Sequence, residues 1–522
     1  MARYPNIHKR VSILAHIRSH AAADQVGLSD GGETLPDEET VRATTLVPWA
    51  AGALDGVGTH HMSSGSDSAA AERLVAAVSA AIAKPDRRRL EALYVLVESA
   101  RSLDVVDLLI ETLRQRGTAR DDVRDLGAWL ASTSPDREPV KLGIALLGAV
   151  GLDERTLDIV RLLGRHEEFT LFAAVALRNG LTVAEPELFA LAQHVCGWGR
   201  IQLVERLAST SDPTIKHWIL REGFRNSVMY EYLAYIAATT GDLAGELAAA
   251  HPDHQLLTAA GEILTALFNG GPTQDIDDYT DGALATDRFT AHMLTHAETI
   301  DDALATWEIE RFIGRDEDWS DRLTRGWTLP LRETLARRCH QILDAPKWAT
   351  VVLSGLGSDE YSVVWRADRL AQRVGVDAYP AHRAKLDVNI VDSWAWQRAL
   401  ALSNTERSDE LLALATDRLP LDAVGTGARD EMGFGPGYEA HMSVDAVLTH
   451  IQGRPGNAPQ VVLAALRSPV TRNRNGAIRA LANWPRGVWP EGSVTIVQEI
   501  AAQDPNEKTR QQAHTVLEGG VT

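Results

Sequence analysis

Two copies of one pattern stand near the end of the chain: PVTRNRNGAIRAL at residues 469–481 and PNEKTRQQAHTVL at residues 505–517. In both copies an arginine, an alanine and a leucine follow the proline at offsets of 5, 8 and 12, and the prolines are 36 residues apart. A unit of about 36 residues accommodates two antiparallel helices and a turn, which is the building block of an α-solenoid. The pattern therefore predicts stacked helical hairpins in this part of the chain.

Helical periodicity dominates from about residue 67 onward. Apolar residues recur three and four positions apart, as at Leu74, Val75, Val78 and Ile82, and this spacing is typical of one face of an amphipathic helix. The alternation of apolar and polar residues that indicates a strand is rare. We therefore expect an all-α fold built from many short helices.

The offsets of 5, 8 and 12 also occur at Pro85, Leu90, Leu93 and Val97. With the repeated pattern at the C-terminal end, they resemble the HEAT class of helical repeats, in which paired helices stack side by side. The resemblance covers about residues 67–270 and the C-terminal pair. It implies an α-solenoid of HEAT-like helical hairpins with long loop insertions. Such folds serve scaffolds, transport receptors, lyases and a few enzymes, so the resemblance implies no single function.

The charge balance of the chain is acidic. The 522 residues include 52 Lys and Arg against 71 Asp and Glu, which gives a formal net charge of −19. This field repels phosphate backbones and favours basic or neutral protein partners. HEAT-like DNA glycosylases grip DNA with a basic face, but here the only run of three basic residues is 87–89. We therefore expect no nucleic-acid partner.

Cysteine usage and hydropathy indicate a reduced, cytoplasmic protein. Cys196 and Cys339 are the only cysteines, and neither has Cys or His neighbours at the short spacings of zinc sites. The apolar run from Val11 is broken by His16 and Arg18, too soon for a signal-peptide core. No run of about 18 apolar residues occurs, so we expect no membrane partner. No motif predicts a cofactor, and the oligomeric state stays open.

Loops and breaks in the periodicity predict four segments. Residues 1–66 form an N-terminal helix and loop segment, and residues 67–270 form a helical-repeat array. Residues 271–420 form an irregular acidic helical region rich in tryptophan, and residues 421–522 contain a Gly-rich loop followed by the C-terminal repeats. The Gly-rich loop, residues 424–443, has five glycines, and loops of this length are more often functional than passive.

Two regions are candidate binding sites. Aromatic side chains set among carboxylates suit a basic peptide or a cationic ligand through cation–π contacts and ion pairs. In the Gly-rich loop, acidic and tyrosine side chains are expected to be displayed for contact. The alternative for the tryptophans is core packing, since large aromatics are usually buried. The candidate binding residues are Trp307, Trp319, Trp327, Asp318, Asp430, Glu431 and Tyr438.

A second hypothesis places chemistry at the N-terminal loop of residues 55–68. His60 and His61 follow Asp55, and imidazoles with a carboxylate nearby serve as metal ligands or as a general base. Adjacent histidines diverge by about 100° on a helix, so a single ion bound by both is not favoured. His441, in the Gly-rich loop, is a further candidate for acid–base chemistry.

The sequence thus favours a cytoplasmic helical-repeat scaffold that binds a protein or peptide partner through a concave groove and loops. The alternative is an enzyme with a dispersed, possibly metal-assisted active site at the N-terminal His-containing loop. No hydrolase, metalloprotease or kinase motif distinguishes them. A structure in which the N-terminal histidines share a cleft with carboxylates of the repeat array would favour the enzyme.

Overall fold

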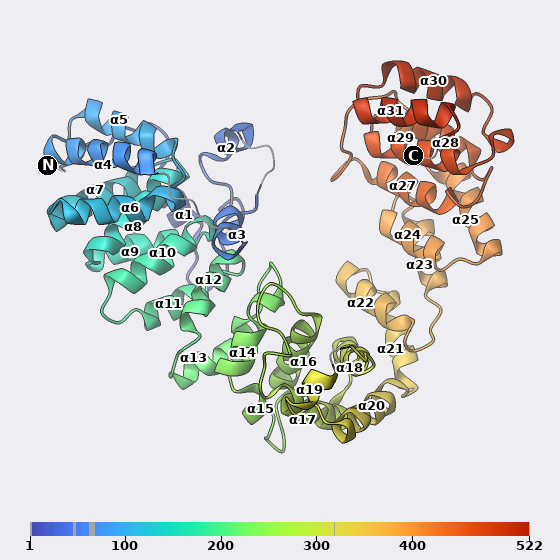
Figure 1. The fold of residues 1–522 in the computed structure, drawn as a ribbon, viewed down its shortest axis with the longest axis horizontal. Helices are drawn as coiled ribbons and strands as arrows, with labels where there is room; N and C mark the ends of the chain where they lie inside the picture. The colour runs from blue at the N-terminus through green and yellow to red at the C-terminus, as the bar shows by residue number, and fades with distance from the viewer. Residues whose placement is uncertain (1–2, 45–48, 62–67, 318, 521–522) are drawn as a thin grey trace. The chain divides into compact units, whose positions relative to one another are not determined.

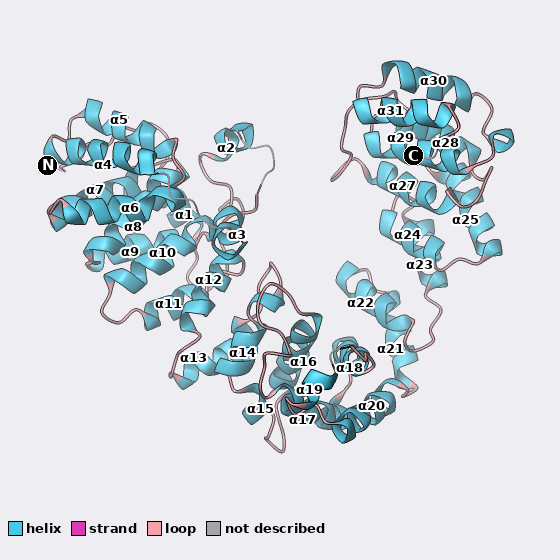
Figure 2. Ribbon diagram, in the orientation of Figure 1, coloured by secondary structure: helices cyan, strands magenta, loops and turns pink. Residues whose placement is uncertain are grey.

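The computed structural model describes residues 3–44, 49–61, 68–317 and 319–520. Helices joined by loops make up these residues, as Figure 2 shows, and no strand occurs among them. The one β-type contact in this part of the chain is an isolated bridge between Glu431 and Val470. The all-α prediction is confirmed. The α-solenoid of HEAT-like hairpins stays a prediction for the chain as a whole.

The chain divides into two compact units. Unit 1 contains residues 1–297 and 305–342, and unit 2 contains residues 298–304 and 343–522. In Figure 1, unit 1 runs from blue to yellow and most of unit 2 is orange and red. This division differs from the four segments predicted from the sequence.

The helices α1 to α20 lie wholly or mainly in unit 1 within the described ranges; the first residues of α18 and the last residue of α20 belong to unit 2. A π-helical turn, Ile219–Gly223, follows the thirteenth. The bounds are α1 Ile13–His20, α2 Glu38–Thr44, α3 Ala53–His61, α4 Ser68–Ala83, α5 Arg87–Glu98, α6 Ser102–Gln115, α7 Arg120–Thr133, α8 Arg137–Val150, α9 Glu154–Gly164, α10 Glu167–Gly180, α11 Glu185–Ala192, α12 Trp198–Leu207, α13 Pro213–Trp218, α14 Ala234–Thr240, α15 Leu243–Glu246, α16 His254–Asn269, α17 Gly282–His296, α18 Ile300–Ile313, α19 Trp319–Leu323 and α20 Leu329–Leu343.

Helices of the first half of unit 1 alternate between two rows. The even-numbered helices α4, α6, α8, α10 and α12 contact one another in series, and α7, α9 and α11 each contact the even-numbered helix that follows. Buried Leu90, Leu93, Leu126 and Leu130 are among the apolar side chains between them. Each amphipathic helix therefore buries its apolar face against its neighbours in the chain.

Local sequence signals explain where these helices begin and approach one another. Asp153 and Thr156 form a reciprocal capping box at the start of α9, which satisfies backbone donors that the first turn leaves free. Gly143 lets α8 lie close to α7, because a Cβ added there would meet a backbone nitrogen of Ala131 at 2.6 Å.

Unit 2 contains the repeated pattern quoted at the start. Its helices are α21 Lys347–Leu356, α22 Tyr361–Ala371, α23 Tyr379–Val388, α24 Ser393–Ala401, α25 Thr405–Arg418, α26 Leu421–Val424, α27 Glu439–Ile451, α28 Pro459–Leu466, α29 Thr471–Asn483, α30 Ser493–Gln503 and α31 Glu507–Leu517. The two copies of the pattern become α29 and α31, which contact one another.

The repeated arginine has one structural role in both copies. Arg474 donates to the carbonyl oxygens of Ser468 and Pro469, six and five residues earlier. Arg510 donates to the carbonyl oxygens of Asp504 and Pro505, at the same two offsets. Each arginine therefore fastens its helix to the turn that precedes it, which explains why the residue recurs with the proline.

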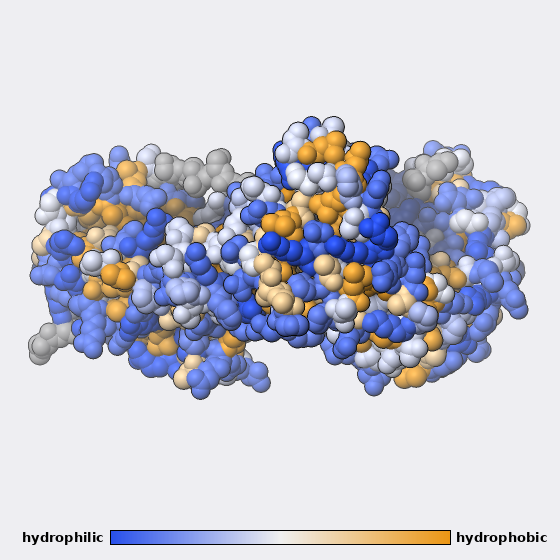
Figure 3. Space-filling model, turned by 90° about the horizontal axis from the view of Figure 1, so that it is seen from below, coloured by the Kyte–Doolittle hydropathy of each residue, from blue (hydrophilic) through white to orange (hydrophobic). Residues whose placement is uncertain are grey.

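The surface of the chain is mixed. In the view of Figure 3, apolar side chains form small groups among hydrophilic ones. None of the helices in the described ranges combines the length and the apolar character that crossing a bilayer requires.

Candidate functional site

Unit 1 contains a polar pocket of about 360 Å³ where segments distant in sequence meet. Its walls come from the N-terminal ends of α8 and α10, from the end of α5, and from the segments that contain α2 and α3. The lining residues are Asp37, Glu38, Thr40, Val41, Arg42, Trp49, Ala50, Leu54, Asp55, Glu98, Arg101, Asp136, Arg137, Glu138, Lys141 and Glu168.

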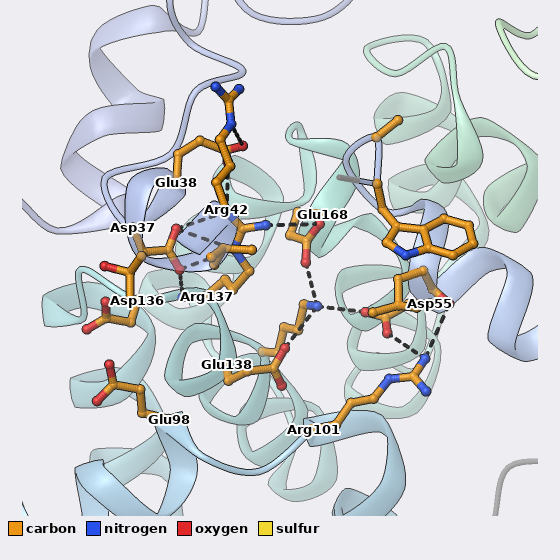
Figure 4. Close-up of a pocket in the computed structure, with 16 residues that line it drawn as sticks. Asp37, Glu38, Arg42, Asp55, Glu98, Arg101, Asp136, Arg137, Glu138 and Glu168 are labelled. Atoms are coloured by element: carbon orange, nitrogen blue, oxygen red, sulfur yellow. Dashed lines mark hydrogen bonds and ion pairs between the residues drawn. The ribbon is translucent and has the colours of Figure 1, made fainter. Parts of the chain in front are cut away.

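Lys141 lies at the centre of the buried charges in this pocket. Its Nζ is 2.7 Å from Asp55, 3.2 Å from Glu138 and 2.6 Å from Glu168. Figure 4 shows these three carboxylates turned toward a common point. Burial opposes the charge of Lys141, but the carboxylates outweigh it and raise the pKa of the ammonium group. The cluster joins α3, α8 and α10.

Arg137 makes a second set of ion pairs beside Lys141. Its guanidinium group lies 3.1 Å from Asp37, 2.9 Å from Glu38 and 3.9 Å from Glu168. Burial alone would raise the pKa of Glu168, but Lys141 and Arg137 together lower it to about 2. Both segments of the N-terminal region are thus held to α8 and α10 by charge.

The lining of the polar pocket carries an excess of negative charge. Seven carboxylates face four basic side chains in the lining, and Arg10, outside the lining, pairs with Asp136 at 2.6 Å. Glu98 forms no ion pair with a described residue, and burial and the charge of Asp136 raise the pKa of its carboxyl group. Trp49, also in the lining, is 50% exposed. The pocket therefore presents an unneutralised carboxylate and an accessible indole.

An apolar groove of about 620 Å³ follows the polar pocket along the same helices. It is lined chiefly by apolar side chains from one face each of α6, α8 and α10. The lining residues are Thr59, Leu103, Val106, Asp107, Ile110, Glu111, Arg114, Ala145, Gly148, Ala149, Leu171, Phe172, Val175, Ala176, Asn179 and Arg206. Residues from the first turns of α8 and α10 line the polar pocket, and residues from their later turns line the apolar groove. Residues of α3 line both.

The N-terminal loop predicted at 55–68 is in part a helix, since α3 spans Ala53–His61. The candidate catalytic residue Asp55 is buried at 3% exposure. Its carboxylate accepts from Lys141, and from Arg101 at 3.2 Å. Asp55 is thus a structural carboxylate that fixes α3, because both of its oxygens are occupied by basic side chains.

His60 also links α3 to the rest of unit 1. Its Nδ1 lies 2.8 Å from the carbonyl oxygen of Gly56 and its Nε2 lies 2.8 Å from Oε1 of Glu205 in α12. Both ring nitrogens face acceptors, so both are best satisfied as donors, and the imidazole is then charged. The hydrogen bond to Glu205 accordingly raises the pKa of His60. Both ring nitrogens are engaged by these acceptors, which assigns His60 a structural role.

The metal form of the enzyme hypothesis finds no support in the geometry. Among the residues that the structure describes, no three His, Cys, Asp or Glu side chains are grouped so that they could hold an ion. The side chain of His61 lies outside the described part. His60 shares its surroundings with carboxylates of the helical array, as the enzyme hypothesis required, but they form ion pairs.

We expect the docking of α3 to depend on pH through His60. Because its folded-state pKa lies above the ordinary value of about 6.5, the pair with Glu205 contributes fully below that pH and is lost as pH rises through the folded pKa. Arg206 opposes this shift in part. Hydrogen-exchange protection of α3 amides should therefore fall as the pH rises above about 6.5. His60→Gln should remove this fall, and an unchanged fall in that variant would contradict the assignment.

The tryptophans proposed as binding residues are largely in the core of unit 1. Trp319 and Trp327 are 6% and 1% exposed and pack against Phe312 at ring-centroid distances of 6.1 and 5.0 Å. Trp307 is half-buried, with Arg311 above its ring. The core-packing alternative therefore fits Trp319 and Trp327, because burial removes their rings from any partner. Asp318 lies outside the described residues.

The Gly-rich loop is fastened to unit 2. Asp430 accepts hydrogen bonds from the side chains of Thr471 and Asn506, at 3.0 and 3.1 Å. Glu431 accepts one from the hydroxyl group of Tyr438 at 3.1 Å. Asp430 therefore holds the loop to the starts of α29 and α31, although its side chain is also exposed, and the bond between Glu431 and Tyr438 lies within the loop.

His441, the candidate for acid–base chemistry, is buried at 7% exposure. Its Nδ1 lies 2.9 Å from Oδ1 of Asn473 and 3.1 Å from the hydroxyl oxygen of Ser468, and Asn473 donates back to its carbonyl oxygen. The network joins α27 to the start of α29. His441 is thus a packing residue, since its side chain is buried within this network.

Sequence reasoning missed most of the charged residues of the polar pocket. Lys141, Arg137 and Glu168 stand in helices, where a charge usually indicates a solvated face. One signal was present: Lys141 falls within the apolar periodicity of α8, between Val140 and Leu142, both buried. A charge at a core position requires partners, and the scarcity of lysine in the chain made this one conspicuous.

Comparison with known proteins finds no match: no family model fits the chain, and no curated protein is significantly similar to it. The function proposed for this chain therefore depends on its own geometry.

Proposed function

We propose that this chain is a helical scaffold that binds a segment of a protein or peptide partner along α6, α8 and α10 of unit 1. The observation that carries the proposal is the apolar groove, whose lining includes half-buried Leu103, Ile110 and Leu171 and exposed Val175. Apolar side chains lined up along neighbouring helices suit the apolar face of an amphipathic partner helix.

The charges around the groove indicate which side chains the partner segment carries. Asp107 and Glu111 on α6 border the apolar floor, and Arg114 and Arg206 lie at the same groove. The polar pocket beyond α3 adds its excess of carboxylates. Together with the net charge of −19, this favours a partner segment that carries basic residues beside its apolar ones.

The enzyme alternative has less support. Of its candidate residues with described side chains, Asp55 and His60 are held in ion pairs and His441 is buried in a hydrogen-bond network. Catalysis by a group requires access to substrate and a protonation state that changes in the reaction. The contacts of these three residues are structural, and they occupy the polar groups that would have to reach a substrate.

A peptide selection with two matched variants tests the groove. Displayed peptides panned against the chain should be enriched in apolar residues spaced three and four apart. Val175→Asp places a charge in the groove at a position 39% exposed, so the fold should tolerate it, and affinity for the selected peptides should fall about tenfold or more. The control is Val95→Asp, at a helical valine 62% exposed and outside the groove.

Binding of the selected peptides to the Val95→Asp variant should match the unaltered chain within about twofold, as for a substitution outside the interface. Failure to enrich any peptide, or equal binding to both variants, would contradict the proposal.

A further inference from the structure

The helix α3 is attached to unit 1 in an unusual way. Its buried positions are Ala53, Asp55, Gly56 and Gly58, whereas Leu54 is 43% exposed. A helix that packs permanently on a protein normally buries a stripe of large apolar side chains. Here a carboxylate and glycines face the protein, and α3 has only nine residues, too few for an isolated helix to be stable.

Ion pairs hold α3 on two sides. Asp55 meets Lys141 of α8 and Arg101, and five positions later His60 meets Glu205 of α12. Positions five apart diverge by about 140° around a helix, so the two charges reach opposite flanks. Arg101 also donates to the carbonyl oxygen of Leu54, and Gln202 donates to the hydroxyl oxygen of Thr59.

Glycines allow the backbone of α3 to lie in direct contact with the rest of unit 1. A Cβ at Gly56 would lie 2.4 Å from the indole of Trp198, so the backbone of α3 lies against that ring. Gly52, just before α3, has φ +70°, and a Cβ there would lie 2.5 Å from the carbonyl oxygen of Glu167. Its N–H donates to Glu168 at 3.0 Å. The surface below α3 therefore accepts small residues and repels larger ones.

This surface has the properties of a built site for a short helix. It offers a basic flank, Arg101 and Lys141, an aromatic floor, Trp198, and an acidic flank, Glu205. Lys141 keeps Glu138 and Glu168 as partners without α3, so an empty site leaves no buried charge unpaired. Buried ion pairs contribute little net stability compared with apolar contacts, so α3 is held less firmly than the helices of the core.

We propose that the surface beneath α3 is an acceptor site for a helix, that α3 occupies it within the chain, and that a partner segment with the same pattern displaces α3. The partner pattern is small residues facing Trp198, an acidic residue for Lys141 and Arg101, and a cationic residue five positions later for Glu205. This rests on the proposed scaffold function and specifies its partner. Because α3 borders both the polar pocket and the apolar groove, its displacement joins them into one binding surface.

The test uses a fluorescein-labelled peptide of residues 49–61 and fluorescence anisotropy. In the unaltered chain α3 competes at a high effective concentration, so the peptide should bind poorly. Gly56→Val clashes with Trp198 and should release α3, so the peptide should bind this variant about tenfold or more tightly than the unaltered chain. Asp55→Asn in the chain releases α3 by a second route and should act in the same direction.

Matched controls separate the possible outcomes. Gly453→Val, at a glycine of unit 2 with nothing within 4 Å of an added Cβ, should leave peptide binding unchanged. A peptide with Asp55→Asn should bind the Gly56→Val chain about tenfold more weakly, as for loss of a charge-assisted pair. Equal binding to the unaltered, Gly56→Val and Asp55→Asn chains, or no binding to any of them, would overturn the inference.

The scaffold proposal and the acceptor-site proposal can be contradicted by different results. If peptide 49–61 does not distinguish the chains while Val175→Asp still weakens the selected peptides, the scaffold function stands and the acceptor site falls. If Val175→Asp has no effect, the scaffold proposal itself falls, whatever peptide 49–61 does.

Discussion

Replacing Lys141 with methionine is expected to destabilise unit 1 by about 3–5 kcal/mol, the usual cost of removing one partner of a buried ion pair. The side chain is 5% exposed and lies within 3.2 Å of three carboxylates. Without the ammonium group, Asp55, Glu138 and Glu168 would repel one another in a poorly solvated site. Methionine keeps most of the volume of the side chain, so the loss measures charge and not a cavity.

The control for Lys141 is Lys84→Met. Lys84 is 72% exposed and 3.8 Å from Asp86, and such surface pairs contribute little. Hydrogen exchange in denaturant, followed for peptides of α8 and α10, reports unit 1 without interference from unit 2. A loss in Lys141→Met no larger than that in Lys84→Met would show that the cluster is not a structural centre.

The second large effect is expected in unit 2. Arg474 and Asp504 are both fully buried, with Nε of the arginine 2.6 Å from the carboxylate. Arg474→Met should destabilise α29 to α31 by about 3–5 kcal/mol, because Asp504 and the carbonyl oxygens of Ser468 and Pro469 all lose a donor. Exchange of the amides in these helices measures the loss.

The repeat supplies a matched control for Arg474. Arg510 donates to the equivalent two carbonyl oxygens but is only half-buried, so Arg510→Met should cost about 1 kcal/mol, as for ordinary hydrogen bonds. The double variant Arg474→Met, Asp504→Leu removes both buried charges and should recover part of the stability. Equal losses for Arg474→Met and Arg510→Met would contradict the different environments of the two repeats.

The helical class and much of the local structure follow from the sequence because they depend on neighbours in the chain. The apolar spacing of three and four at Leu74, Val75, Val78 and Ile82 predicted a helix, and these residues form the buried face of α4. The equal offsets of Arg474 and Arg510 from their prolines reflect equal hydrogen bonds to the preceding turn. Contacts between residues five or six positions apart can therefore be recognised as a repeated spacing in the sequence.

Contacts between residues far apart in the sequence produce no such spacing and could not be predicted. The partners of Lys141 come from positions 55, 138 and 168, and their convergence depends on how α3, α8 and α10 pack. Gly56 and Gly58 are typical of the loop predicted at residues 55–68, but tertiary contacts with α10 and α12 stabilise a helix over Ala53–His61. Local pattern also could not show that Trp319 and Trp327 face the core.

The distribution of charge gives the binding account its physical logic. Along α8 and α10, early turns carry paired charges and later turns carry apolar side chains. The ion pairs fix the N-terminal segments without covering the apolar groove. A partner segment with apolar and basic residues would bury its apolar side chains in the groove and place its basic side chains near the carboxylates of the polar pocket.

Hydrogen exchange with a groove-selected peptide at saturation tests the scaffold most directly. The account predicts slower exchange in α6, α8 and α10 around residues 103–110, 145–149 and 171–179, with no change in unit 2. Protection confined to unit 2, or none in these three helices despite tight binding, would contradict it.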